Sequence, residues 1–335
     1  MREEIEMREL SFEDVIARLR EPADTLVLFH RNPDADAVGS AFALRRVLED
    51  LGSRAWCVCE SELPERLQFL TDGMQESVLP ESIPEDFENI RVFSVDSAAP
   101  SQLGELYDLY GDCVDMMIDH HEMGFPYADY YIPPHAAATG EILFDIVKRL
   151  ATDGLVEVTE PLCTALYAAI SADTGCFRFS NVTPETHLRA AELVESGIDC
   201  AEINQKLFST FTLGQLRARA AGVSNLHLHA NGKIAVITFP YALKVALGLE
   251  DSDLDTLVDV ARSLQGVKIA ASIRQPETEG VFRVSVRSSC GYDIADLCVG
   301  FGGGGHRKAA GCTIEAADCD EAMQKLVAAI DVEKL

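Results

Sequence analysis

Histidine and aspartate side chains of the kind that bind divalent cations lie in four short segments of this 335-residue sequence. They are His30, Asp34, Asp36, Asp96, Asp119, His120, His121 and Asp173. A set rich in carboxylates, with few imidazoles and no thiolate, favours manganese or magnesium over structural zinc. The set is large enough for two ions with one carboxylate between them. Two divalent cations about 3.5–4 Å apart form a clamp that stabilises in-line attack on phosphorus.

Each segment taken alone also has an ordinary structural explanation. Asp34 and Asp36 would be normal capping residues near the start of a helix, and Asp96 a normal turn residue. Asp173 could end a helix, although a carboxylate is unfavourable at that end of the helix dipole. An adjacent pair of histidines beside an aspartate, as in 119–121, is harder to explain structurally. Because all four segments lie at the ends of predicted elements, we favour a shared metal site over coincidence.

The elements that must position these residues are short apolar strands alternating with helices. The predicted strands are Thr25–His30, Arg54–Cys59, Arg91–Asp96 and Cys113–Asp119. Leu44, Val47, Leu48 and Leu51 follow helical spacing between the first two strands, and 161–172 is a predicted helix that ends before Asp173. This order predicts a parallel sheet with helices on both faces. Three of the segments then follow parallel strands and can meet at one edge of the sheet.

The remaining third of the chain predicts a second, smaller α/β domain. Its predicted strands are Ile234–Phe239, Val267–Ile273 and Val281–Arg287, with a helix at Asp253–Leu264. A polar helical stretch precedes them. We therefore predict an N-terminal metal-binding domain over 1–199, a helical connector over 200–222 and a C-terminal substrate-binding domain over 223–335.

A run of four glycines in this second domain could bind an anion. Gly302 to Gly305 would let backbone N–H groups approach an anion closely, and His306 adds a donor that can be charged. Arg287 offers a planar fork suited to phosphate. The alternatives are a flexible turn before a helix-like segment, and an exposed surface arginine. We predict that an anionic ligand is bound by Arg287, Gly303, Gly304, Gly305 and His306, and the resemblance described below implies that this ligand is the substrate.

The composition excludes several classes of function. With 28 basic and 55 acidic residues, the net charge of −27 excludes a basic nucleic-acid coat protein or a polybasic membrane anchor. We find no apolar run long enough to span a bilayer and no apolar leader at the start of the sequence. The ten cysteines contain no CxxC pair. We therefore expect a cytoplasmic protein with no membrane partner.

The motifs together resemble the DHH phosphoesterase superfamily, in its two-domain form with a DHH-associated C-terminal domain. The matching segments are HRNPDADAVGS at 30–40, VDS at 95–97, DHH at 119–121, ADTG at 172–175 and GFGGGGHRKAAG at 300–311. They occur in the family's order across nearly the whole chain. Stand-alone proteins of this size resemble the nanoRNase family, described as oligoribonuclease and 3′-phosphoadenosine 5′-phosphate phosphatase.

The resemblance implies a role for each matching residue. One manganese would be held by His30 and Asp34, the other by Asp36, His120 and Asp173, with Asp96 bridging the two. His121 would assist the leaving oxygen or the phosphate, Asp119 would orient a neighbouring imidazole, and Arg287 and His306 would hold the terminal phosphate of the substrate. Magnesium is an alternative to manganese.

The implied substrates are short single-stranded RNA or DNA oligonucleotides and nucleotide bisphosphates, cleaved by a metal-activated water. Long duplexes are not expected, and a homodimer is left open. Two positions depart from the family pattern. Ala35 stands where glycine is frequent, and 122–124 lacks an asparagine that is common after DHH. These departures leave the metal set intact and bear on substrate detail.

Several alternatives to this function are kept. The chain could hydrolyse linear or cyclic dinucleotides, act as a RecJ-like single-strand exonuclease, or be a non-catalytic nucleotide-binding regulator. A manganese-dependent inorganic pyrophosphatase shares the first-domain motifs but resembles the chain less beyond residue 200. A non-catalytic regulator would be expected to lack a metal ligand, and none is missing here.

Overall fold

The computed structural model describes residues 7–121 and 124–335, except for the side chain of His306. The chain divides into two compact units, Met1–Thr210 and Phe211–Leu335. Of the two helices in the predicted connector, α8 (Cys200–Phe208) belongs to the first unit and α9 (Leu213–Ser224) to the second.

The first unit is built on a five-stranded parallel sheet in the order β2-β1-β3-β4-β5. The strands are β1 (Asp24–Leu28), β2 (Arg54–Val58), β3 (Arg91–Val95), β4 (Val114–Ile118) and β5 (Tyr130–Tyr131). The first four are the predicted strands, ending one or two residues earlier than expected. The two-residue β5 at the edge is too short to show any periodicity in the sequence.

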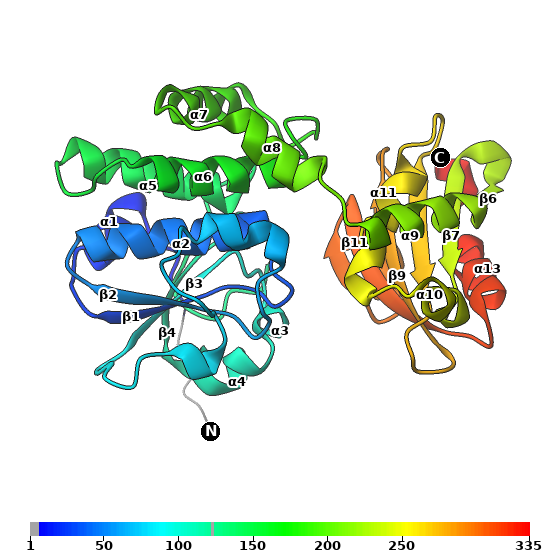
Figure 1. Cartoon of the computed structure of the whole chain (residues 1–335), viewed down its shortest axis with the longest axis horizontal. Helices are drawn as coiled ribbons and strands as arrows, with labels where there is room; N and C mark the ends of the chain where they lie inside the picture. The colour runs from blue at the N-terminus through cyan, green and yellow to red at the C-terminus, as the bar shows by residue number, and fades with distance from the viewer. Residues whose placement is uncertain (1–6, 122–123) are drawn as a thin grey trace. The chain divides into compact units, whose positions relative to one another are not determined.

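Helices cover both faces of this sheet, as predicted (Figure 1). Leu26 and Leu28 pack in the cluster that contains Leu103 and Leu106, whereas Val27 lies in the larger core on the opposite face. The helices on the larger core are α1 (Phe12–Leu19), α2 (Ala35–Asp50), α5 (Thr139–Thr152) and α6 (Glu160–Asp173). On the other face lie α3 (Pro100–Leu103) and α4 (Glu105–Tyr110), and α7 (Pro184–Glu195) packs on α6.

Three helices of the larger core pack closely through glycine. A Cβ added to Gly39 of α2 would lie 2.4 Å from the Ala165 carbonyl oxygen of α6. A Cβ added to Gly140 of α5 would lie 2.5 Å from the Ala169 Cβ, also on α6. Both distances are shorter than a carbon contact allows, so only glycine fits. This packing fixes α2, α5 and α6 relative to one another.

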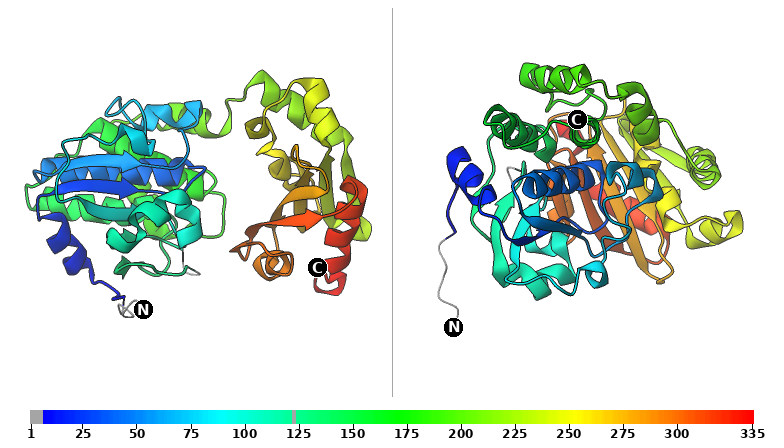
Figure 2. Two further views of the ribbon diagram at one scale, coloured as in Figure 1. Left: turned by 90° about the horizontal axis from the view of Figure 1, so that it is seen from below. Right: turned by 60° about the vertical axis from the view of Figure 1, so that its left-hand side comes forward.

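The second unit contains a six-stranded mixed sheet in the order β10-β11-β9-β8-β7-β6. Its strands are β6 (Leu226–His229), β7 (Ile234–Phe239), β8 (Ile269–Arg274), β9 (Val281–Ser288), β10 (Gly304–His306) and β11 (Ala309–Glu315). The helices are α9, α10 (Tyr241–Leu247), α11 (Leu257–Arg262), α12 (Ile294–Val299) and α13 (Cys319–Ala329). α9 and α11 pack against one face of β7 and β8, and α13 packs against the other (Figure 2). The prediction of a smaller α/β domain is confirmed.

The segment after the glycine run is a strand and not the expected helix-like segment. In β11 the buried residues Ala310, Cys312 and Ile314 alternate with more exposed neighbours. This period of two is the pattern of a strand with one buried face. The predicted helix at Asp253–Leu264 is a short 3₁₀ turn, Asp251–Leu254, followed by α11.

Within the described ranges, the helices are all too short or too polar to cross a bilayer.

Candidate metal centre

The predicted ligands converge at the carboxyl edge of the parallel sheet, next to β1 and β3. β1 lies between β2 and β3, so the chain leaves β1 towards one side of the sheet and later returns on the other. The crevice at such a switch in strand order is where open α/β sheets bind ligands. His30 lies two residues after the end of β1, and Asp96 directly follows β3.

A first group of candidate ligands consists of His30, Asp34 and Asp96. His30 Nε2 lies 3.8 Å from Asp34 Oδ1 and 3.6 Å from Asp96 Oδ2. Asp34 is the N-cap of α2, and its Oδ1 accepts hydrogen bonds from the N–H groups of Asp36 and Ala37. The capping explanation for Asp34 is therefore correct, and it does not remove the side chain from the cluster.

A second group consists of Asp36, His120 and Asp173. His120 Nε2 lies 3.2 Å from Asp173 Oδ2 and 3.9 Å from Asp36 Oδ2. The same nitrogen lies 3.7 Å from Asp96 Oδ1. The two oxygens of Asp96 thus face different groups, with Oδ2 towards His30 and Oδ1 towards His120. The structure brings together all six residues that the family resemblance assigned to the two ions.

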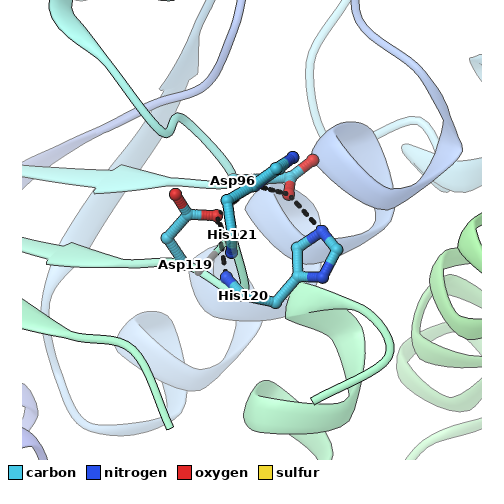
Figure 3. A group of neighbouring side chains, drawn as sticks. All are labelled: Asp96, Asp119, His120 and His121. Atoms are coloured by element: carbon cyan, nitrogen blue, oxygen red, sulfur yellow. Dashed lines mark hydrogen bonds and ion pairs between the residues drawn. The ribbon is translucent and has the colours of Figure 1, made fainter. Parts of the chain in front are cut away.

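Asp119 holds the two histidines that follow it (Figure 3). Its Oδ1 accepts hydrogen bonds from the N–H groups of His120 and His121, at 2.7 and 3.3 Å, and lies 2.6 Å from His121 Nδ1. His121 Nδ1 also lies 3.9 Å from Asp96 Oδ1. The Asp119 side chain is fully buried. Asp119 therefore lies behind the pair and orients the His121 ring, as a carboxylate commonly does for an imidazole at a metal site.

The start of α5 provides contacts that the sequence did not indicate. The N–H groups of Thr139 and Gly140 donate to Asp36, at 2.7 and 2.9 Å. The Thr139 hydroxyl donates to Asp96 Oδ1 at 2.9 Å. Asp36 is thereby held at a helix N-terminus, where the unpaired N–H groups and the helix dipole favour a negative charge. Thr139 belongs to none of the motifs found in the sequence, so sequence patterns provided no signal for it.

The turn after Asp173 is also fixed. The Asn181 side chain donates to the backbone carbonyls of Ala137 and Asp173, at 3.0 and 3.1 Å. It thereby ties the end of α6 to the segment that leads into α5. Cys176 and Phe177 both have positive φ, at 59° and 60°, which is an uncommon conformation for residues with a side chain.

Burial and the neighbouring charges shift the pKa values of these side chains, often in opposite directions. Asp36 and Asp96 are 0% and 2% exposed. Burial raises the pKa of Asp36 well above its usual value, and the charges of Asp96 and Asp173 raise it further. Burial also acts to raise the pKa of Asp96, but the neighbouring imidazoles of His30, His120 and His121 lower it overall. Burial lowers the pKa of His120, yet the Asp173 carboxylate, 3.2 Å from Nε2, raises it well above its usual value.

These residues fit a divalent cation. Placing several carboxylates together out of water is unfavourable unless a positive charge compensates them. The buried His120 Nε2 has no hydrogen-bond partner among the described residues, although carboxylates lie on the side it faces. An imidazole nitrogen directed at carboxylates without a hydrogen bond is what a shared metal ligand set provides. The donor set of oxygen and imidazole nitrogen suits manganese or magnesium.

Of the predicted substrate residues in the second unit, Arg287 lies on β9, Gly304 to His306 form β10, and Gly303 directly precedes β10. Arg287 pairs in register with Ala309, and Ala309 pairs with His306. Arg287 is half-buried, and one of its terminal nitrogens donates to the Val286 carbonyl at 3.0 Å. Burial lowers the pKa of Arg287 from its usual value. The His306 side chain lies outside the described residues, as do Glu122 and Met123 of the predicted departure from the family pattern.

The glycines of the run have different surroundings. A Cβ on Gly303 would lie 2.1 Å from the Gly311 carbonyl oxygen, and one on Gly305 would lie 2.6 Å from that of Ala309. Close packing against β11 therefore explains these two glycines. A Cβ on Gly304 would meet nothing within 4 Å, and this residue is exposed. Gly304 is thus the member of the predicted set that packing does not explain.

Comparison with known proteins agrees with this arrangement. The model of the DHH family, N-terminal domain, matches residues 24–170, and that of the DHHA1 domain matches 231–332. A bifunctional oligoribonuclease and PAP phosphatase, NrnA, from Thermus thermophilus is 31% identical over 306 residues, covering 91% of this chain and 88% of that protein. The chain belongs to the DHH family.

Other relatives extend the comparison. NrnA of Bacillus subtilis is 27% identical, covering 88% of this chain and 91% of that protein. A cyclic-di-AMP phosphodiesterase, PdeA, of Listeria monocytogenes is 26% identical, but the match spans only 47% of its length. The crystal structure of an exopolyphosphatase-related protein from Bacteroides fragilis has the same fold, with a TM-score of 0.84, 22% identity and coverage of 96% of this chain and 95% of that one. The predicted family and class of enzyme, a DHH phosphoesterase, are confirmed.

Proposed function

We propose that this DHH-family enzyme hydrolyses very short oligonucleotides to nucleoside 5′-monophosphates and removes the 3′-phosphate of 3′-phosphoadenosine 5′-phosphate, with two manganese ions as cofactors. The observation that carries the proposal is the pair of ligand groups that share Asp96 at the carboxyl edge of the sheet. The near full-length match to two proteins named for both activities supports it.

In this proposal each ligand group holds one ion. His30 and Asp34 would hold the first, Asp36, His120 and Asp173 would hold the second, and Asp96 would contribute one oxygen to each. Two bound divalent cations activate a water and neutralise the charge that develops on the phosphorus oxygens.

The remaining residues orient the reacting groups. Asp119 Oδ1 accepts a hydrogen bond from His121 Nδ1, which fixes the ring and directs its other nitrogen away from Asp119. We assign His121 the contact with the phosphate or the leaving oxygen. In the second unit, Arg287 would hold the terminal phosphate through a charge-assisted, bidentate contact, with His306 and the N–H of Gly304 as further donors.

The strongly acidic composition supports short substrates. A protein that follows a long polyanion normally offers a basic groove, since each neutralised phosphate adds affinity through released counterions. Here the net charge is −27, and the proposed cationic contacts are confined to one strand region of the second unit. A single phosphate contact region of this kind suits a short substrate better than a long polyanion.

Hydrolysis of linear or cyclic dinucleotides is the second candidate. The relative PdeA is named for cyclic-di-AMP hydrolysis, and the match covers 91% of this chain. A pApA-type linear dinucleotide is also a very short oligonucleotide, so one site could serve both substrates.

A substrate panel tests the proposal. Initial rates are measured with manganese on 5′-labelled single-stranded RNA and DNA from two to about 24 nucleotides, beyond the ~4–16 nucleotides that a single-strand-binding module covers. The panel adds a duplex, 3′-phosphoadenosine 5′-phosphate, cyclic-di-AMP and pyrophosphate. We expect the highest rates on dinucleotides and trinucleotides, release of phosphate from the bisphosphate, and poor cleavage of duplexes. Rates that rise steadily with length would contradict the proposal and favour a RecJ-like exonuclease.

A further inference from the structure

Thr139, the first residue of α5, contacts two of the candidate metal ligands at once. Its N–H donates to Asp36 Oδ2 at 2.7 Å, and its hydroxyl donates to Asp96 Oδ1 at 2.9 Å. All three residues are buried, with exposures of 2% or less. Asp36 comes from the start of α2 and Asp96 from the end of β3, so one residue joins the two acidic segments.

The carboxylate of Asp96 has few other restraints. Its backbone has a φ of 52°, and its N–H donates to the Ile118 carbonyl at 3.0 Å. Within the described part of the chain, Thr139 provides the one hydrogen bond to this carboxylate. The neighbouring imidazole nitrogens of His30, His120 and His121 lie farther away, at 3.6 to 3.9 Å.

The Thr139 hydroxyl contacts one particular oxygen of the Asp96 carboxylate. It binds Oδ1, the oxygen that faces His120, and leaves Oδ2 facing His30. An oxygen that accepts one hydrogen bond keeps a second lone pair. Rotation of the carboxylate would break this bond, so Thr139 maintains the arrangement in which each oxygen serves a different ligand group.

The donor itself cannot easily move. Threonine is branched at Cβ and has restricted χ1 rotation. The next residue, Gly140, packs against Ala169 of α6 and donates its N–H to Asp36 Oδ1. The start of α5 is therefore held by both a packing contact and hydrogen bonds.

We propose that Thr139 is a positioning residue whose hydroxyl orients the Asp96 carboxylate between two cations. The inference rests on the proposed two-metal function and adds to it a residue outside the ligand set. It explains why a polar hydroxyl is buried beside Asp96, where its removal would leave the bridging carboxylate free to turn towards one group.

Two substitutions separate the hydroxyl from the shape of the side chain. Thr139→Val keeps the branched shape and the backbone N–H but removes the hydroxyl, whereas Thr139→Ser keeps the hydroxyl. Thr238→Val is the matched control, because Thr238 is also buried and its hydroxyl contacts His227 in the second unit at 3.4 Å. If Thr139→Val does not fold, Thr139→Ala replaces it, since alanine also lacks the hydroxyl.

The readout is manganese binding to metal-depleted protein by titration calorimetry, with the fold checked by circular dichroism. We expect Thr139→Val to lose about 10- to 100-fold in affinity for at least one ion, which is the usual effect of losing a hydrogen bond to a metal ligand. Thr139→Ser and Thr238→Val should bind like the wild type. Wild-type affinity in Thr139→Val, or equal losses in the Val and Ser variants, would overturn the proposal.

Substrate hydrolysis is measured separately on the same proteins. A wild-type protein that binds two ions but cleaves none of the substrate panel would refute the proposed function. The affinity ratio between the Val and Ser variants would then still decide the role of Thr139.

Discussion

Gly140→Ala should disrupt the candidate metal centre through packing alone, without removing any ligand. The added Cβ would lie 2.5 Å from the Ala169 Cβ, whereas carbon atoms in contact lie ~3.5–4.0 Å apart. α5 and α6 must therefore separate by about 1 Å. Because Gly140 donates to Asp36 and the preceding Thr139 donates to Asp36 and Asp96, the separation moves these contacts.

Gly140→Ala should therefore lower the stability of the protein modestly and its activity strongly. Overpacking of this kind costs ~1–3 kcal/mol, and for a unit of this length that corresponds to a fall of about 2–12 °C in unfolding temperature. A misplacement of about 1 Å can lower turnover ~100-fold. We therefore expect a folded protein of modestly reduced stability and strongly reduced activity. The measurements are the unfolding temperature, initial rates on a dinucleotide with manganese, and manganese affinity.

Ala169→Gly provides a compensating change. In the double variant the nearest remaining atom to the new Cβ is the Leu166 carbonyl oxygen at 3.3 Å, so activity should recover even though a glycine inside α6 costs ~1 kcal/mol of stability. Gly291→Ala is the control, because its Cβ would meet nothing within 4 Å and its φ is not in the left-handed region. Wild-type activity and metal affinity in Gly140→Ala, or no recovery in the double variant, would refute the packing argument.

Three further outcomes are expected. Asp96→Asn should abolish turnover while circular dichroism shows a retained fold, because it removes the shared negative charge; a folded variant with full activity would contradict the shared-ligand assignment. Arg287→Ala should lower kcat/KM by about 10- to 150-fold, the equivalent of losing a charged hydrogen bond of ~1.5–3 kcal/mol, and should leave manganese affinity unchanged. Loss of metal binding in calorimetry would show that metal binding and substrate binding are not divided between the two units. Adding manganese to chelator-treated protein should raise the unfolding temperature, because a manganese concentration of 100 times the dissociation constant adds about 2.7 kcal/mol to the free energy of unfolding. An unchanged unfolding temperature would argue against a cation among these buried carboxylates.

Local sequence patterns were sufficient to predict the type of fold and the types of residue at the site. Apolar strand runs followed by Asp or His are local patterns, and the carboxyl ends of parallel strands share one edge. His30, Asp96 and the DHH segment could therefore be placed at that edge without coordinates. β7 was predicted from Ile234 to Phe239, the bounds that the structure shows, because five of its six residues are apolar; all six are buried.

Features that depend on residues far apart in the chain could be seen only in the folded protein. The Thr139 N–H and its acceptor Asp36 are separated by 103 positions, and no local periodicity reports such a pair. The same holds for the glycine contacts of α5 and α2 with α6, which are visible only once the helices are packed. β11 was not predicted from the sequence, because the preceding glycine run drew attention away from the alternation of apolar and polar residues in 309–315. In the structure β11 pairs with β9 and β10. Sequence patterns specify which groups can do the chemistry, whereas long-range packing and hydrogen bonding hold those groups in place.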